Sequence, residues 1–74
     1  MEFDYSKLKG RIIEKFDSYG NFSKAMGFTK SQLSNRLNNV YEWTQDDICR
    51  ADELLELDNL KEYFFTKAQE VEEN

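Results

Sequence analysis

The chain has 74 residues, enough for one small domain that buries about 60% of the surface exposed by its unfolded form. Its single cysteine and its lack of histidine exclude an intramolecular disulfide framework and a clustered zinc site. The N-terminus lacks the features of a signal peptide, and no apolar run approaches the roughly 18 residues that span a bilayer, so we expect a cytosolic protein without membrane contact.

Charge is unevenly distributed along the chain. Ten Lys and Arg residues stand against fifteen Asp and Glu residues, a net charge of −5. Residues 1–43 hold seven basic and five acidic side chains, a balance of +2, whereas residues 44–74 hold three and ten, a balance of −7. Because phosphate attraction depends on the field over the contacting face, a mildly basic half can contact DNA while the acidic half points away.

The first predicted helix covers residues 6–16. Its apolar residues recur with a period of about 3.6 and so share one stripe, formed by Leu8, Ile12, Ile13 and Phe16. Asp4 or Ser6 is placed to cap it. Gly10 costs this helix up to about 1 kcal/mol relative to Ala, so either the backbone approaches a neighbour there or the helix is imperfect.

Residues 18–21 form a predicted turn that leads into a second helix over residues 22–26. Asn21 is the predicted N-cap, because its side-chain oxygen can accept hydrogen bonds from the exposed N–H groups of the first helical turn. Gly27 follows this helix and marks the turn to the next one.

Thr29 is placed to cap a third helix that runs to about Asn38. Leu33 and Leu37 are four residues apart and therefore share its inner face. Asn39 can end the helix in the left-handed conformation, which asparagine tolerates better than most residues.

After a short extended connection over residues 40–43, Thr44 is the predicted cap of a fourth helix. Asp46 and Asp47 favour the positive end of that helix, and Trp43 and Ile48 occupy the two positions of a hydrophobic staple. The inner stripe of this helix is formed by Ile48, Ala51, Leu54 and Leu55.

Asp58 is the predicted cap of a fifth helix. Its apolar side is formed by Leu60, Tyr63 and Phe64, with Phe65 flanking them. The sequence therefore predicts an all-α fold of five short helices in a single domain over residues 1–65. We expect the acidic residues 66–74 to be a frayed tail.

The second and third predicted helices carry the features of a helix-turn-helix: the apolar and small residues Phe22, Ser23, Met26, Gly27, Phe28 and Leu33. On these residues the chain resembles the lambda-repressor-like domains of phage Cro and repressor proteins. From residue 5 to 65 it is similar to a family of small phage proteins described as Cro repressors. A bulky side chain at Ser23 would hold the two helices apart, and a Cβ at Gly27 would resist the φ > 0 conformation of the turn.

One position departs from the pattern of the broad family. The residue three after Leu33 is usually apolar, but here it is Arg36, and Leu37 follows one place later. Some Cro proteins share this four-residue spacing, so the resemblance is specifically Cro-like. Arg36 then lies at the edge of the helix, where it could contact phosphate.

The resemblance implies that the third helix enters the major groove of DNA while the second crosses the backbone. The residues placed toward base edges are Thr29, Lys30, Ser31, Ser34 and Asn35. Lys30 can donate to guanine, and Asn35 can pair with adenine through a donor and an acceptor. The predicted phosphate contacts are Asn21, Lys24, Arg36 and Asn38, with Lys7, Lys9 and Arg11 as weaker candidates.

Other features have structural explanations. The aromatic residues are expected mainly in the core, with some of Trp43, Tyr63 and Phe65 as an alternative dimer surface; the core set is Tyr41, Trp43, Tyr63, Phe64 and Phe65. Cys49 is expected to be a buried small apolar residue. The sequence contains no catalytic base near neutrality, no phosphate loop and no calcium-loop spacing, so we expect no enzyme activity, no cofactor and no metal.

The leading hypothesis is a Cro-like transcriptional regulator of phage or prophage origin that binds a double-stranded DNA operator. A homodimer on paired half-sites would supply affinity that one helix lacks, and it could form only on DNA. The alternative is a protein-binding module, such as an antirepressor, that uses the acidic C-terminal half. The charge around the third helix distinguishes them: a basic surround favours DNA, and an acidic one favours a protein partner.

Overall fold

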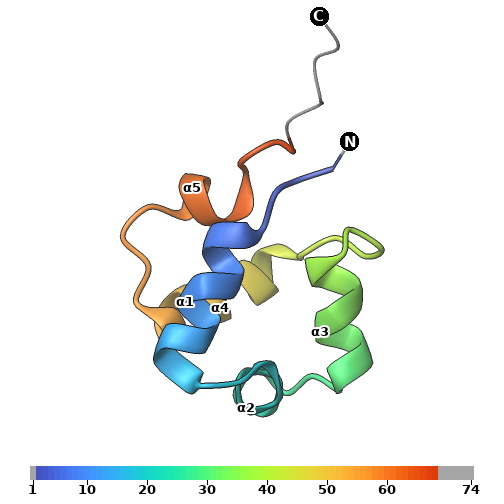
Figure 1. Ribbon diagram of the computed structural model, residues 1–74, viewed down its shortest axis with the longest axis vertical. Coiled ribbons are helices and arrows are strands. Elements are labelled where there is room, and N and C mark those ends of the chain that lie inside the picture. Colours follow the sequence, from blue (N-terminus) through green and yellow to red (C-terminus); the bar gives the residue numbers. More distant parts are fainter. Residues whose placement is uncertain (1, 69–74) are drawn as a thin grey trace, which may run out of the picture.

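Five helices form over residues 2–68, the part of the chain that this computed structural model describes (Figure 1). They are α1 Ser6–Phe16, α2 Tyr19–Met26, α3 Lys30–Leu37, α4 Gln45–Leu55 and α5 Leu60–Phe64. The predicted all-α fold of five short helices is confirmed. The longest of these helices have 11 residues, too few to cross a membrane.

The core is built around α1, which contacts α2, α4 and α5, while α2 also contacts α3 and α4. Its buried apolar side chains are Tyr5, Leu8, Ile12, Phe22, Met26, Leu33, Leu37, Trp43, Ala51, Leu55, Tyr63 and Phe64. Ile13 was expected in the same stripe but is 43% exposed, because it follows Ile12 by about 100° around the helix.

The N-caps of α3 and α4 form as predicted. Thr29 and Thr44 each accept a hydrogen bond from the backbone N–H three residues later, and the side chains of Gln32 and Asp47 each accept one from the backbone N–H of the cap residue. Both are complete capping boxes, which fix where each helix begins. At α1 the N-cap position is held by Tyr5, without a side-chain capping hydrogen bond, so the predicted cap at Asp4 or Ser6 was wrong; Asp4 Oδ1, one residue earlier, accepts from the N–H of Ser6 at 2.8 Å.

The predicted N-caps of α2 and α5 were wrong. Ser18, in an extended conformation, accepts from the N–H of Asn21, so α2 begins three residues earlier than predicted. Asn21 instead donates its side-chain N–H to the carbonyl of Phe16, satisfying an open carbonyl at the end of α1. For α5 the cap is Asn59 rather than Asp58, since Asn59 Oδ1 accepts from the N–H of Lys61.

The two terminal segments lie side by side at one end of the molecule (Figure 1). Phe3 and Lys67 form an isolated antiparallel bridge, and the N–H of Asp4 donates to the carbonyl of Thr66 at 2.7 Å. Residues 66–68 of the predicted tail therefore pair with the N-terminal segment. Residues 69–74 lie outside the described residues.

Asn39 joins the end of α3 to this pair. It adopts the predicted left-handed conformation, with φ 64°. Its side-chain Oδ1 accepts from the N–H of Phe3 at 3.0 Å, and its Nδ2 donates to the carbonyl of Phe3 at 2.9 Å. The amide side chain thus occupies both hydrogen-bonding groups of one N-terminal residue.

Candidate functional site

The helices α2 and α3 are joined by a short turn that begins at Gly27. Gly27 has φ 79°, and its N–H donates to the carbonyls of Ser23 and Lys24. The N–H of Phe28 also donates to the carbonyl of Ser23, at 2.8 Å. Two short helices joined by a three-residue turn with a left-handed glycine have the layout of a helix-turn-helix.

Ser23 lies where these helices come close. Its side chain is only 3% exposed, which agrees with the predicted need for a small residue there. Its Oγ is buried and has no hydrogen-bond partner within the part of the chain that the structure describes. A larger side chain would separate α2 from its neighbours, because interiors are packed too closely to admit one.

The predicted base-reading residues differ in how free they are. Lys30, Ser31 and Ser34 are exposed on α3. Thr29 is exposed too, but its hydroxyl already accepts the capping hydrogen bond from Gln32. Asn35 is half-buried, and its backbone carbonyl accepts from the N–H groups of residues 40 and 41. The accessible polar face of α3 is therefore centred on Lys30, Ser31 and Ser34.

The predicted phosphate contacts also differ in whether their side chains already make hydrogen bonds within the protein. Lys24 and Asn38 are exposed, although Asn38 Nδ2 donates to Ser34 Oγ at 3.2 Å. Asn21 is exposed, but its amide is bonded to the end of α1. Lys24 is thus the predicted phosphate contact whose side chain has no recorded hydrogen bond among residues 2–68.

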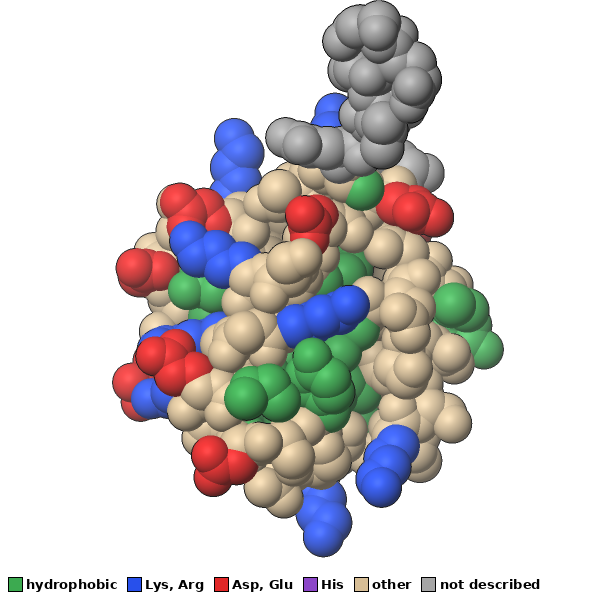
Figure 2. Space-filling model, in the orientation of Figure 1, with side chains coloured by type: hydrophobic (Ala, Val, Ile, Leu, Met, Phe, Trp, Pro, Cys, Tyr) green, Lys and Arg blue, Asp and Glu red, His purple; other side chains and the backbone are tan. Residues whose placement is uncertain are grey.

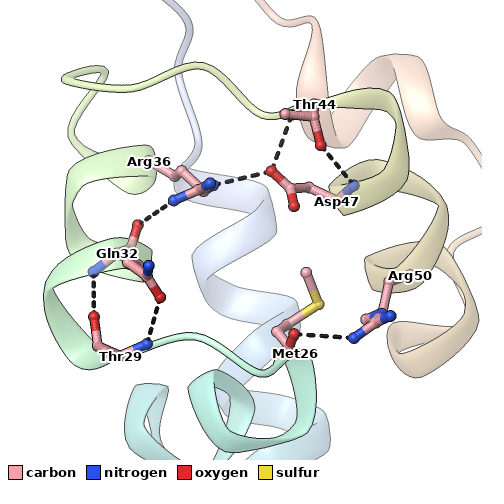
Figure 3. Close-up of polar contacts among 7 residues, drawn as sticks. All are labelled: Met26, Thr29, Gln32, Arg36, Thr44, Asp47 and Arg50. Atoms are coloured by element: carbon pink, nitrogen blue, oxygen red, sulfur yellow. Dashed lines mark hydrogen bonds and ion pairs between the residues drawn. The ribbon is translucent and has the colours of Figure 1, made fainter.

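Arg36 has an internal role that its position in the sequence does not indicate. Its Nε donates to Asp47 Oδ2 at 3.0 Å, and its Nη1 donates to the carbonyl of Gln32 (Figure 3). Its guanidinium also lies 4.4 Å from the ring centroid of Phe28. The side chains of the ion pair are only 16% and 15% exposed. A phosphate contact by Arg36 stays a prediction, but its guanidinium is committed to holding α3 against α4.

Asp47 completes this arrangement. Burial raises the pKa of its carboxyl, but hydrogen bonds from Thr44 and Arg36 outweigh that effect, so the pKa lies below its usual value. The side chain is therefore ionised at neutral pH and able to pair with Arg36. The position of Asp47 in the first turn of α4 is predictable from the local sequence, because acidic residues favour that end of a helix. Its pairing with Arg36 of α3 is not, because no local pattern connects the two residues.

A second arginine joins α2 to α4. Arg50 Nη1 donates to the carbonyl of Met26 at 3.2 Å, at the C-terminal end of α2 (Figure 3). A cation at this end complements the helix dipole. No pattern in the sequence indicates this role of Arg50. Arg36 of α3 thus bonds to Asp47 of α4, and Arg50 of α4 bonds to the end of α2. These two contacts hold α2 and α3 against α4.

The segment that contains α2 and α3 has no negative side chain. Residues 18–41 include no Asp or Glu. Lys24 and Lys30 from this segment and Lys9 from α1 form no ion pair among residues 2–68, whereas Lys7 and Arg11 pair with nearby glutamates. Figure 2 shows blue side chains along the lower edge, where α2 and α3 lie, and most red side chains on the left and at the top.

A different surface lies at the C-terminal end of α3. A hollow of about 490 Å³ is bordered there by Val40, Tyr41 and Phe65, which are 62%, 56% and 48% exposed. We call these three residues the aromatic surface. The predicted core positions of Tyr41 and Phe65 were wrong: Tyr41 lies in the loop after α3, Phe65 lies just beyond α5, and both side chains are exposed there.

Cys49 is also placed differently from expectation. It is exposed on α4 rather than buried. The buried positions of that helix are Ala51 and Leu55, and a residue two places before Ala51 faces the opposite side.

Comparison with known proteins identifies a family and similar solved structures. The family model described as "Protein of unknown function (DUF739)" matches residues 1–67. No curated protein matches the chain. The solution structure of the modulator of repression (MOR) of the temperate bacteriophage TP901-1 from Lactococcus lactis is 39% identical, with a TM-score of 0.77. The match covers 93% of this chain and 97% of that one. The chain therefore belongs to the DUF739 family.

Proposed function

We propose that this chain is a phage regulatory protein that modulates repression. The support is its similarity, over nearly the full length of both chains, to a protein named a modulator of repression. Exposed polar side chains on α3 and a segment without acidic residues, 18–41, are features of a binding protein. We propose that it acts in the host cytoplasm by binding, without catalysis and without a cofactor.

The partner that α2 and α3 favour is operator DNA. The observation that carries this proposal is the absence of acidic residues from residues 18–41, combined with two exposed lysines in the helix-turn-helix. In this Cro-like arrangement Lys30, Ser31 and Ser34 read base edges, and Lys24 contacts phosphate. Arg36 is not needed for contact, because it already stabilises the position of α3.

Affinity for DNA should depend on two copies. Each lysine bound to a phosphate contributes about 0.9 to the slope of log affinity against log salt, and this chain has few unpaired lysines near α3. With a net charge of −5, one copy binds weakly. We propose binding to paired half-sites about one helical turn apart, with the homodimer formed on DNA.

Selection of binding sites from random duplexes, repeated at two salt concentrations, tests the DNA proposal. We expect one sequence to be enriched. Lys30→Ala should then lower affinity for it by about 1–3 kcal/mol. Lys61→Ala, on α5 and outside the helix-turn-helix, is the matched control and should leave affinity unchanged. Failure to enrich any sequence would remove DNA as the partner.

A second candidate partner is another regulator, such as a phage repressor protein. The aromatic surface carries this candidate, because large exposed apolar side chains gathered around one hollow are typical of protein interaction sites. The word "modulator" in the name of the similar protein fits an action on a repressor. In this form of the proposal, the chain is an antirepressor whose contact lies beside α3 rather than on it.

Calorimetric titration with the repressor from the same phage genome tests this candidate. Tyr41→Ser should weaken binding by about tenfold or more, as expected for an aromatic residue near the centre of an interface. Ile13→Ser is the matched control, since Ile13 is exposed on α1 away from that hollow. Equal effects of the two substitutions, or no binding at all, would count against this candidate.

A further inference from the structure

A hollow of about 400 Å³ lies where α1, α2 and α3 meet. We call it the lysine hollow and define it by six of its lining residues: Lys9, Tyr19, Ser23, Lys30, Leu33 and Leu37. It shares no lining residue with the hollow at the aromatic surface. Figure 2 shows a cluster of hydrophobic side chains in the middle of the displayed face, with Lys or Arg side chains beside it.

The hollow has a mixed lining with an apolar part. Tyr19 supplies most of the exposed apolar surface, with 43% of the residue exposed, and Leu33 and Leu37 lie behind it almost fully buried, while Ser23, Ser34 and Asn38 add polar groups. Apolar groups that meet water in a concave site favour an apolar occupant, because burial removes that surface from water. The side chain of a Leu, Ile or Phe residue has the matching chemistry.

The rim of the hollow is positive. Lys9 from α1 and Lys30 from α3 both line it, and neither forms an ion pair among the described residues. None of its lining residues is acidic. Gly20 lies beneath the stem of Lys30, where an added methyl group would sit 3.7 Å from Lys30 Cε. Both ammonium groups are therefore available to a carboxylate held over the apolar part of the lining.

We propose that the lysine hollow is a docking site for an acidic amphipathic segment of a partner protein. One apolar side chain of that segment enters the hollow, and flanking Asp or Glu side chains pair with Lys9 and Lys30. The charge complementarity of the rim selects an acidic segment, and the exposed ring of Tyr19, backed by Leu33 and Leu37, selects an apolar side chain on it. DNA supplies the negative charge but no apolar side chain, so it matches only half of this chemistry.

Occupation of the hollow has a regulatory consequence. Lys30 and Ser34 line the hollow and also belong to the face of α3 proposed to read DNA. The docked segment and DNA therefore exclude each other. This consequence rests on the proposed DNA binding, whereas docking of the segment does not.

A helical peptide of about 15 residues, with Phe and Leu on one face and Glu beside them, is a suitable probe. Its binding to the full chain is followed by backbone amide shifts in NMR spectra. We expect the largest shifts around Tyr19, Lys9 and Leu37. A matched peptide with Gln in place of Glu should bind more weakly by about threefold to fivefold, as should Lys9→Gln with the acidic peptide.

Lys61→Gln is the matched control, because Lys61 is an exposed lysine of α5 that does not line the lysine hollow. It should leave peptide affinity unchanged. Equal effects of Lys9→Gln and Lys61→Gln, equal binding of the Gln peptide, or shifts confined to Tyr41 and Phe65 would each overturn the docking site.

A labelled duplex carrying the selected operator separates the two proposals. Displacement of the duplex by the acidic peptide supports mutual exclusion, and simultaneous binding overturns it. If no duplex binds the chain, the proposed DNA function fails, while the effect of Lys9→Gln on peptide binding still decides the docking site.

Discussion

Arg36 Nε donates to Asp47 Oδ2 at 3.0 Å, and this ion pair joins α3 to the first turn of α4 (Figure 3). The same Asp47 oxygen accepts from the N–H of Thr44 at 3.0 Å. One carboxylate therefore caps a helix and binds an arginine of the helix-turn-helix. The acidic half of the chain does more than face away from α3, because it supplies the counter-charge that fixes the orientation of that helix.

Arg36→Gln should destabilise the fold by about 1–3 kcal/mol, since it removes the charge opposite a mostly buried carboxylate. The free energy of unfolding in urea, followed by the fluorescence of the single Trp, measures the effect. Lys24→Gln, on the exposed side of α2, should change stability by less than about 0.5 kcal/mol. Equal stabilities of the two variants would contradict the structural role of Arg36.

Stability should fall in acid partly through Asp47. Its pKa in the folded chain lies below the usual value of 3.8, so its contribution is complete above that pH and is lost as the pH falls through the lower folded pKa. Asp47→Asn should therefore destabilise the protein at pH 7 more than at pH 3. Unfolding measured at both pH values tests this, and a constant difference between the two proteins would argue against it.

Gly27→Ala and Gly10→Ala should shift stability in opposite directions. Gly27 has φ 79°, so alanine there costs about 1–2 kcal/mol. Gly10 lies in α1 with nothing within 4 Å of an added Cβ, so alanine should stabilise the helix by up to about 1 kcal/mol. Thermal unfolding of both variants checks the pair. A stable Gly27→Ala variant would mean that the turn accepts another conformation.

Asn39→Gly should loosen the N-terminal segment while preserving the backbone of the loop. Glycine adopts φ 64° without strain but cannot make the two hydrogen bonds to Phe3. We expect faster hydrogen exchange at the amide of Phe3 and a loss of about 1–2 kcal/mol in stability. Asn38→Gly, which removes only the contact with Ser34, is the control and should leave exchange at Phe3 unchanged.

Lys24→Ala should weaken binding to every DNA sequence alike and reduce the salt slope by about 0.9, if Lys24 contacts one phosphate. Titrations of the selected site and of random DNA at several salt concentrations measure both quantities. An unchanged slope would remove Lys24 from the proposed phosphate contacts. A loss restricted to the selected site would instead indicate a base-reading role.

Local patterns in the sequence determined the five helices, the caps at Thr29 and Thr44, and the left-handed residues Gly27 and Asn39. These features depend on residues within one or two helical turns of one another, so their physical causes are visible in short stretches of the chain. The predicted cap at Asn21 was wrong because two polar residues three positions apart could each start the same helix. Ser18 did so, which left the amide of Asn21 free for α1.

Only the tertiary structure decided which side chains lie together at and around α3. The sequence placed Arg36 on the outer edge of a helix, but folding brings Asp47 beside it, and the pair is held by burial and by the ring of Phe28. Likewise Lys9 reaches the hollow beside Lys30 only because α1 packs across α2. Such contacts join residues that are distant in the chain, so no local period or spacing records them.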